Sequence, residues 1–301
     1  GFIGANLCRH LLAEPAVDEV VVVDDLSSGS KDNLEGVAVE TLVGSILDDD
    51  VLDEALTRAS SVVHLAARPS VPRSIADPVA SHDVNATGTM RVLEAVRRHD
   101  VPHVVVASSS SVYGANPTLP KHEDLAPSPQ SPYAASKLAA ESYTLAWARV
   151  WAFEALAFRF FNVFGPLQPA GHAYAAVVPA FVDAALAGRS VEVHGDGRQT
   201  RDFTFVDTVS AVLTRAVTAQ VACDGPVNLA FGGRYELMAV LDLLEGILGH
   251  PIARHHAPPR AGDVRDSQAD CGRLRRLFPD IEPTSLEDGL HQTVEWFRSI
   301  A

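Results

Sequence analysis

The stretch that decides the fold is residues 1–25, GFIGANLCRHLLAEPAVDEVVVVDD. Gly1 and Gly4 have the spacing of the last two glycines of a GxxGxxG phosphate loop, and a helical pattern follows from about Asn6 to Ala13. Glycine lets the backbone approach a pyrophosphate at the N-terminus of such a helix. The apolar run from Glu19 to Val23 then predicts a strand. The pattern is typical of a dinucleotide site.

An acidic side chain ends this strand. Asp24 follows the glycines by about twenty residues, where a carboxylate accepts hydrogen bonds from ribose hydroxyls and repels a 2′-phosphate. The position favours NAD over NADP, the alternative being a solvated acid at a strand end. The first glycine of the loop and its strand are absent, so we expect about ten residues, including the central strand, to precede Gly1.

Apolar runs alternate with helical patterns in the first half, as in βαβ units around a parallel sheet. Strands are expected at 19–23, 39–43, 61–65, 103–107, 155–160 and 191–194. Helices are expected at 6–13, 49–59, 79–98, 132–150, 178–187, 206–219, 237–248 and 286–299. These elements predict an α/β fold, a doubly wound parallel-sheet Rossmann domain with a smaller α/β substrate-binding lobe. We assign residues 1–163 and 206–229 to the Rossmann domain, and residues 164–205 and 230–301 to the lobe.

The composition excludes several classes of protein. Hydrophobic residues make up 47% and charged residues 21% of the 301, as in soluble globular proteins. The net charge of −14 argues against a nucleic-acid partner. No apolar stretch of membrane-spanning length and no signal-peptide pattern occur, so we expect a cytoplasmic protein with no membrane association. The three cysteines are scattered, and the histidines lack ligand spacing, so no metal site is expected.

A second group of residues indicates redox chemistry on an alcohol. Tyr133 and Lys137 are four residues apart and share one face of the expected helix. A nearby ammonium lowers the pKa of a phenol, and so does the start of a helix, which Ser131-Pro132 predicts just before Tyr133. Both effects favour a phenolate base. The alternative is a packed tyrosine beside a solvated lysine, but the serine run at 108–111 and the glycines favour the catalytic interpretation.

The chain resembles the extended short-chain dehydrogenase/reductase family of NAD-dependent epimerases and dehydratases, and within it the UDP-sugar 4-epimerases. The likeness runs through GFIG, VVVDDLSSG, VVHLAA (62–67), VNATGT, ASSSSVYG (107–114), SPYAASK, FRFFNVFGP (158–166), GDGRQTRDF (195–203) and RAGDVRDSQAD (260–270). The order and spacing of these segments together are specific.

The resemblance implies roles for individual residues. It implies Ser109, Tyr133 and Lys137 as catalytic residues, with Ser109 hydrogen-bonding the sugar O4. The implied NAD-lining residues are Gly1, Phe2, Ile3, Gly4, Asp24, Ser45, Ile46, Ala66, Asn85, Tyr133 and Lys137. The implied substrate residues are Ser109, Asn162, Arg201, Arg260, Asp263 and Ser267. Ser45 departs from the family, which often has an acid there that holds the adenine amine.

The resemblance also implies a reaction. Dehydratases of this kind have Thr-Asp-Glu where this chain has Ser109, Ser110 and Ser111, so epimerisation at C4 of a UDP-hexose is the simplest chemistry. Ser267 leaves room for an N-acetyl group, which favours UDP-GlcNAc as a substrate, with UDP-glucose also accepted. The alternatives are a UDP-glucuronate 4-epimerase, a 4-keto reductase, or a noncatalytic NAD-binding sensor. The family also implies a homodimer through the helices at 79–98 and 132–150.

Overall fold

The computed structural model describes residues 1–171, 175–258 and 265–300. The helices are α1 (Phe2–Leu12), α2 (Asp49–Leu56), α3 (Val71–Ala76), α4 (Pro78–His82), α5 (Gly88–Arg98), α6 (Pro132–Trp151), α7 (Val177–Leu186), α8 (Val206–Thr218), α9 (Leu237–Leu248), α10 (Gly272–Leu277) and α11 (Leu286–Ser299). The strands are β1 (Val21–Asp24), β2 (Glu40–Val43), β3 (Val62–His64), β4 (His103–Ser109), β5 (Glu154–Phe160), β6 (Asn162–Phe164), β7 (Val191–His194), β8 (Thr200–Arg201), β9 (Phe203–Phe205), β10 (Val227–Leu229), β11 (Tyr235–Glu236) and β12 (Arg254–Ala257). Short turns η1 (Lys31–Leu34), η2 (Asp83–Thr87) and η3 (Ser110–Tyr113) complete the fold.

Two parallel sheets form the first half of the fold. β1 pairs with β2, and a four-stranded sheet has the order β10-β5-β4-β3, with every pair parallel. The α/β class with parallel sheets is therefore confirmed. Among the described residues, β1 and β3 are not hydrogen-bonded to each other, so the two parallel sheets are separate. A cavity separates them, lined by β1 on one side and β3 on the other.

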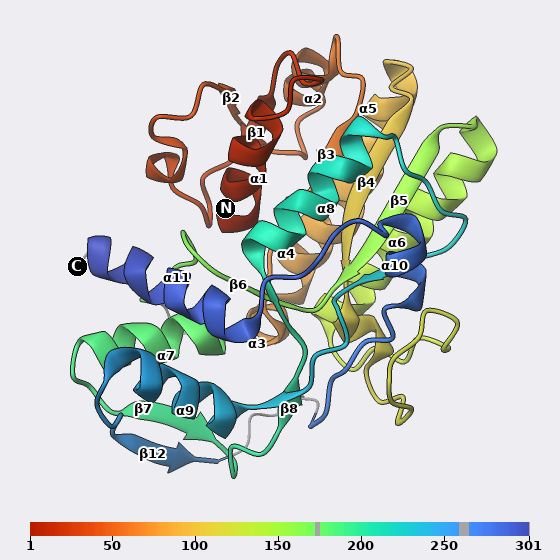
Figure 1. Ribbon diagram of the computed structural model, residues 1–301. Helices are drawn as coiled ribbons and strands as arrows, with labels where there is room; N and C mark the ends of the chain where they lie inside the picture. The colour runs from red at the N-terminus through yellow and green to blue at the C-terminus, as the bar shows by residue number, and fades with distance from the viewer. Residues whose placement is uncertain (172–174, 259–264, 301) are drawn as a thin grey trace.

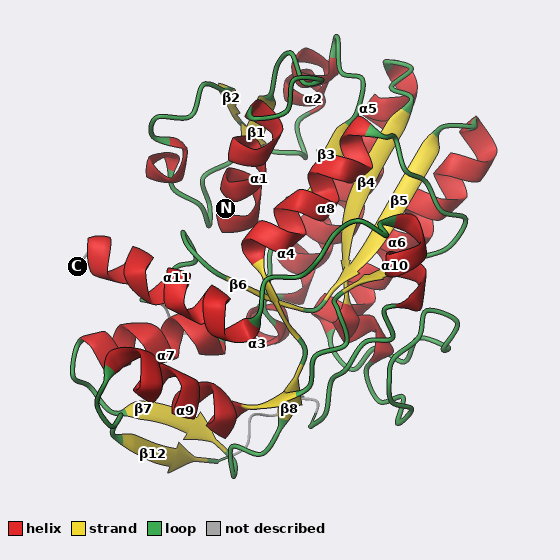
Figure 2. Ribbon diagram, viewed as in Figure 1, coloured by secondary structure: helices red, strands yellow, loops and turns green. Residues whose placement is uncertain are grey.

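Helices cover both faces of the four-stranded sheet, which is the layered arrangement that βαβ connections produce (Figures 1 and 2). Successive side chains of β4 point to opposite faces, as a strand requires. Val105 packs with residues of α1, α8 and α10 in one cluster, whereas Val104 and Val106 pack with α2 and α5 in another. All seven residues of β4 are buried, so this strand lies at the centre of the core.

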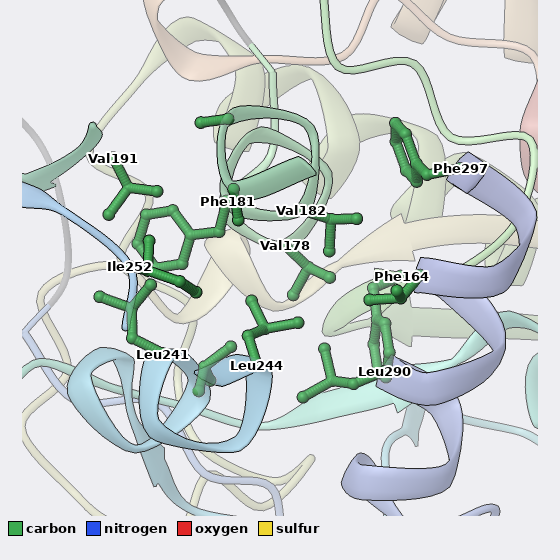
Figure 3. Close-up of a cluster of buried hydrophobic side chains, with 14 of the residues drawn as sticks. Phe164, Val178, Phe181, Val182, Val191, Leu241, Leu244, Ile252, Leu290 and Phe297 are labelled. Atoms are coloured by element: carbon green, nitrogen blue, oxygen red, sulfur yellow. The ribbon is translucent and has the colours of Figure 1, made fainter. Parts of the chain in front are cut away.

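The second half of the chain has a core of its own (Figure 3). Leu241 and Leu244 of α9 and Leu290 of α11 are fully buried there, with Phe164 and Phe181 beside them. Three small sheets, β7-β12, β8-β11 and β6-β9, surround this core. α10, which the sequence analysis assigned to the smaller lobe, packs through Leu274 into the core of the first sheet.

The structure changes several expected boundaries. α1 begins at Phe2 rather than at Asn6, because Gly1 already acts as its N-cap. The single helix expected over residues 79–98 consists of α4, the π-helical turn η2 and α5. The sequence did not predict α3, β6, β8, β9, β10, β11, β12 and α10, which are all short. None of the described helices is both long enough and apolar enough to span a bilayer.

Candidate active site

A cavity of about 1260 Å³ runs along β1 and β3, between the two parallel sheets, and reaches the carboxyl ends of β4 and β5. The carboxyl ends of parallel strands are where α/β folds bind their ligands. Eleven of the predicted residues line it, namely Gly1, Phe2, Ile3, Gly4, Asp24, Ser45, Ile46, Ala66, Ser109, Tyr133 and Lys137. The fold therefore brings the glycine loop, the acid after β1 and the expected catalytic group to one space.

The start of α1 and the end of β1 form one wall of the cavity. Oδ2 of Asp24 lies 3.1 Å from the nitrogen of Gly1, and its other oxygen accepts a hydrogen bond from the Leu26 amide at 2.8 Å. A Cβ atom added to Gly1 would meet no atom within 4 Å, so the space above the helix start is open. Backbone amides at a helix N-terminus, open space and a nearby carboxylate fit a pyrophosphate and an unphosphorylated ribose of NAD.

The loops after β2 and β3 form the neighbouring wall. Ser45 accepts a hydrogen bond from the Leu47 amide at 3.2 Å, and Ile46 is buried against Gly88. Asn85 is fully buried and does not line the cavity. Its side-chain oxygen instead accepts a hydrogen bond from the Arg68 amide at 2.7 Å, and its side-chain nitrogen donates to the hydroxyl of Ser136 at 3.0 Å. Asn85 therefore supports the loop that lines the cavity.

The start of α6 places the expected base. Ser131 caps the helix by accepting from the Ala134 amide at 3.1 Å, and Pro132 occupies its first turn, as predicted. The Tyr133 amide donates to the hydroxyl of Ser74 in α3 at 3.0 Å, which ties the start of α6 to a second helix. The phenol of Tyr133 hydrogen-bonds to Ser109, the last residue of β4. The predicted pair of side chains is thus in contact.

The electrostatics of this pair differ from the sequence expectation. Burial raises the pKa of Tyr133, and the hydrogen bond from Ser109 offsets only part of this rise. We expected the opposite direction from the neighbouring lysine and the helix start. Burial also lowers the pKa of Lys137 to about 8. Removal from water disfavours the charged form of both groups, and here it outweighs the other effects.

A buried ion pair lies beneath the catalytic group. Glu141 is one turn beyond Lys137 on α6, and it receives two hydrogen bonds from Arg159 of β5, at 2.7 and 2.9 Å. The hydroxyl of Ser108, next to Ser109, donates to the same carboxylate at 2.7 Å. This network joins α6 to β4 and β5. The sequence analysis missed it, although the four-residue spacing of Tyr133, Lys137 and Glu141 was a visible signal.

The described substrate residues gather around β8. Asn162 bonds the carbonyl of Asp202 through its amide and its side chain, at 3.1 and 3.2 Å. The guanidinium of Arg201 donates to the carbonyl of Arg265 at 3.1 Å, and the Ser267 amide donates to that of Thr200 at 3.1 Å. None of the three lines the cavity described above. The other two predicted substrate residues, Arg260 and Asp263, lie outside the described residues.

Asp202 is a residue that the sequence analysis missed, although it stands in the quoted segment GDGRQTRDF. It is fully buried, and its Oδ2 accepts hydrogen bonds from the amides of Gly232 at 3.1 Å and Ala269 at 3.0 Å. Burial raises its pKa to about 7, and the backbone hydrogen bonds limit that rise. Among the described residues, no cluster of three or more His, Cys, Asp or Glu side chains is arranged to bind a metal ion.

Comparisons with known proteins agree with this geometry. The sequence profile of the NAD dependent epimerase/dehydratase family matches residues 1–230. A UDP-glucose 4-epimerase of Mycolicibacterium smegmatis is 37% identical, over 99% of this chain and 96% of its own length.

Solved structures extend the likeness to the whole fold. A UDP-N-acetylglucosamine 4-epimerase from Methanobrevibacter ruminantium, in complex with UDP-N-acetylmuramic acid, superposes with a TM-score of 0.93 at 32% identity, covering 100% of this chain and 96% of that one. A UDP-glucuronic acid 4-epimerase from Bacillus cereus, in complex with UDP-glucuronic acid and NAD, gives a TM-score of 0.90 at 26% identity, covering 100% and 97%.

Proposed function

The chain belongs to the NAD-dependent epimerase/dehydratase family, and on that premise we propose that it inverts C4 of a UDP-hexose through a transient 4-keto sugar. The contact between Ser109 and Tyr133, at the wall of the cavity that the glycine loop and Asp24 share, carries this proposal. Ser110 and Ser111 stand where an eliminating enzyme would need acids. The chain therefore keeps the groups for oxidation of an alcohol and lacks those for dehydration.

Each catalytic side chain has one task in this proposal. When bound, NAD supplies reversible hydride transfer at C4 of the sugar. Tyr133 takes the proton of the O4 hydroxyl as C4 is oxidised to a carbonyl, and returns a proton to O4 when the keto sugar is reduced on its opposite face. Ser109 holds the same oxygen and orients it toward the phenol. Lys137, with its pKa of about 8, is mostly protonated at neutral pH and can donate to the ribose hydroxyls.

The nucleotide half of the substrate is assigned to the second lobe. Arg201 and Arg260 supply cations for the diphosphate, because a guanidinium binds two phosphate oxygens at once. This anchor holds the diphosphate while the 4-keto ring turns over between the two half-reactions. Ser267 is small, which leaves room for an N-acetyl group at C2 of the sugar. We therefore assign UDP-GlcNAc and UDP-GalNAc as one substrate pair, with UDP-glucose and UDP-galactose as the other.

A second candidate function is epimerisation of UDP-glucuronate, because the relative from Bacillus cereus was solved with that sugar nucleotide and with NAD. It uses the same catalytic residues and differs only in the group at C6. The two functions are separated by supplying each UDP-sugar alone.

The working form is proposed to be a homodimer through the helices α4, α5 and α6. Val79 is 69% exposed, Val150 is 68% exposed and Trp151 is 43% exposed on these helices. Apolar side chains of this size gain free energy when a partner covers them. Sedimentation of the NAD-loaded protein tests this part of the proposal, and a monomer at every concentration contradicts it.

The reaction is tested by proton NMR of UDP-GlcNAc, UDP-glucose and UDP-glucuronate, each incubated with NAD-loaded protein. We expect anomeric signals of the galacto product from at least one hexose, and Tyr133→Phe is expected to lower the rate by about a hundredfold or more. Tyr143→Phe removes a hydroxyl from the exposed side of the same helix and serves as the matched control. Equal rates for the wild type and Tyr133→Phe would remove the phenol from the mechanism.

A further inference from the structure

Asp202 stands at the centre of the substrate lobe, between Arg201 and the strand β9. The carboxylate is 0% exposed. The amides of Ala269, Gly232 and Gly233 lie close enough to the carboxylate to limit the rise of its pKa, and among the described residues its Oδ1 atom makes no hydrogen bond of ordinary geometry. A buried carboxylate is costly unless hydrogen bonds compensate it, so the backbone amides that Asp202 accepts from matter for its stability.

The contacts of Asp202 reach three separate segments. Its carbonyl accepts both hydrogen bonds of Asn162, which leads out of β5. Its carboxylate accepts from the amide of Gly232, in the loop after β10, and from that of Ala269. Gly232 has a φ of +82°, so this loop has a backbone conformation that depends on glycine. The carboxylate of Asp202 thus joins the loop after β10 to the segment that ends at Ala269, and its carbonyl holds Asn162.

The segment that carries Ser267 is held by hydrogen bonds at every second residue, namely at Arg265, Ser267 and Ala269. The amide of Thr200 donates to the carbonyl of Arg265 at 3.0 Å, and the Ser267 amide donates to the Thr200 carbonyl at 3.1 Å. The third bond is donated by the Ala269 amide to the carboxylate of Asp202 at 3.0 Å. The carbonyl of Arg265 also accepts a hydrogen bond from the guanidinium of Arg201. Without the carboxylate of Asp202, the Ala269 amide loses its acceptor, and the backbone bonds to Lys121 on the other side remain to hold this end of the segment.

We propose that Asp202 is a positioning residue for the UDP-sugar: its carboxylate fixes the segment that bears Ser267 against the loop after β10, next to Arg201, while its carbonyl holds Asn162. This inference rests on the proposed function of the site. Asp202 does not touch the substrate; it fixes the backbone from which the binding side chains extend. Its loss therefore weakens nucleotide binding more than it slows the chemical step at Ser109 and Tyr133, which belong to the other lobe.

The test measures the affinity of the NAD-loaded protein for UDP by calorimetry. Asp202→Ala removes both acceptors and is expected to weaken UDP binding by at least about tenfold. Asp202→Asn keeps one acceptor oxygen for the two amides and is expected to lose about threefold, a partial rescue. In both variants KM for the UDP-sugar rises, whereas kcat and NAD affinity stay within about twofold of wild type.

Glu245→Gln provides the matched control. Glu245 is a carboxylate of the same lobe that accepts the amide of Ile252 at 2.9 Å, away from the substrate residues. It is expected to leave UDP affinity unchanged. Should Asp202→Ala fail to fold, Asp202→Asn decides alone. Wild-type UDP affinity in a folded Asp202 variant, or an equal loss in Glu245→Gln, overturns the inference. A wild type that binds UDP but converts no hexose contradicts only the proposed reaction.

Discussion

The ion pair between Glu141 and Arg159 allows a quantitative prediction about stability. The two side chains are 5% and 3% exposed, and two charge-assisted hydrogen bonds of 2.7 and 2.9 Å join them. Burial alone lowers the pKa of Arg159, but the hydrogen bonds and charge of Glu141 raise it above its ordinary value. The guanidinium also lies 4.7 Å from the centre of the Tyr113 ring. Each charge is therefore stabilised in the protein interior mainly by its partner.

Removal of one partner leaves the other charge buried and unpaired. Glu141→Leu or Arg159→Met alone is expected to lower the free energy of unfolding by about 3–5 kcal/mol. The double variant leaves no unpaired charge, so it should lose only about 1–2 kcal/mol, chiefly from the lost acceptor of Ser108. The coupling energy between the two sites is then at least about 4 kcal/mol, far beyond that of an exposed pair.

Urea unfolding, followed by circular dichroism, measures these free energies with NAD present at one fixed concentration. The exposed pair Arg91 and Asp49, 2.9 Å apart, is the matched control, and its coupling should stay below about 1 kcal/mol. A double variant of Glu141 and Arg159 that loses as much as the two single variants added together would refute the argument.

Three further predictions concern other parts of the structure. The pKa of Lys137 is about 8 in the folded protein, against an ordinary 10.5. The unfolded chain therefore holds this proton more tightly, and the folded state gains stability as the pH rises from 8 to 10.5. Urea titrations should find Lys137→Met more stable than the wild type at pH 7, with an advantage that shrinks by roughly 2 kcal/mol at pH 9.5; a constant difference contradicts the burial of the charge. Asp24→Asn removes the carboxylate beside Gly1, and fluorescence titration should give it a higher NADP to NAD affinity ratio than the wild type, by about tenfold; an unchanged ratio would mean that Asp24 does not select the cofactor. Gly114 has a φ of +47°, and a Cβ there would lie 1.8 Å from the Ser128 carbonyl oxygen. Gly114→Ala should therefore lower the unfolding free energy by about 3 kcal/mol, measured by urea unfolding. A loss below about 1 kcal/mol would contradict this backbone conformation at Gly114.

Elements with a clear apolar periodicity were predictable, because that signal is local. The bounds of β7, α9 and α11 agree with the expected ranges. In α11, an apolar stripe follows Ser285, whose hydroxyl caps the helix by accepting from the Asp288 amide. β8 and β11 contain two residues each and β12 is mostly exposed, so none of them carries an apolar alternation. Tertiary pairing alone creates such strands.

Some features of the candidate site were likewise predictable from local sequence, whereas others depend on the packed structure. Gly1, Asp24, Ser109 and Tyr133 carry their chemistry at fixed spacing, so the sequence predicted residues that the fold brings to one cavity. The direction of the pKa shift of Tyr133 was not predictable, because burial is a property of the packed structure. The hydrogen bonds of Asp202 could not be predicted for the same reason. A sequence gives the identity of an acid, but it does not show that the distant amides of Gly232 and Ala269 donate hydrogen bonds to it.

The central claim is that C4 is oxidised and reduced inside the site, and the fate of the hydrogen on C4 tests it most directly. UDP-GlcNAc and UDP-glucose carrying deuterium at C4 are each incubated with the NAD-loaded protein, and the products are examined by proton NMR and mass spectrometry. The account predicts inversion at C4 with the deuterium retained in the product of at least one of the two. Inversion with loss of the deuterium to solvent, or no inversion of either sugar, would contradict it.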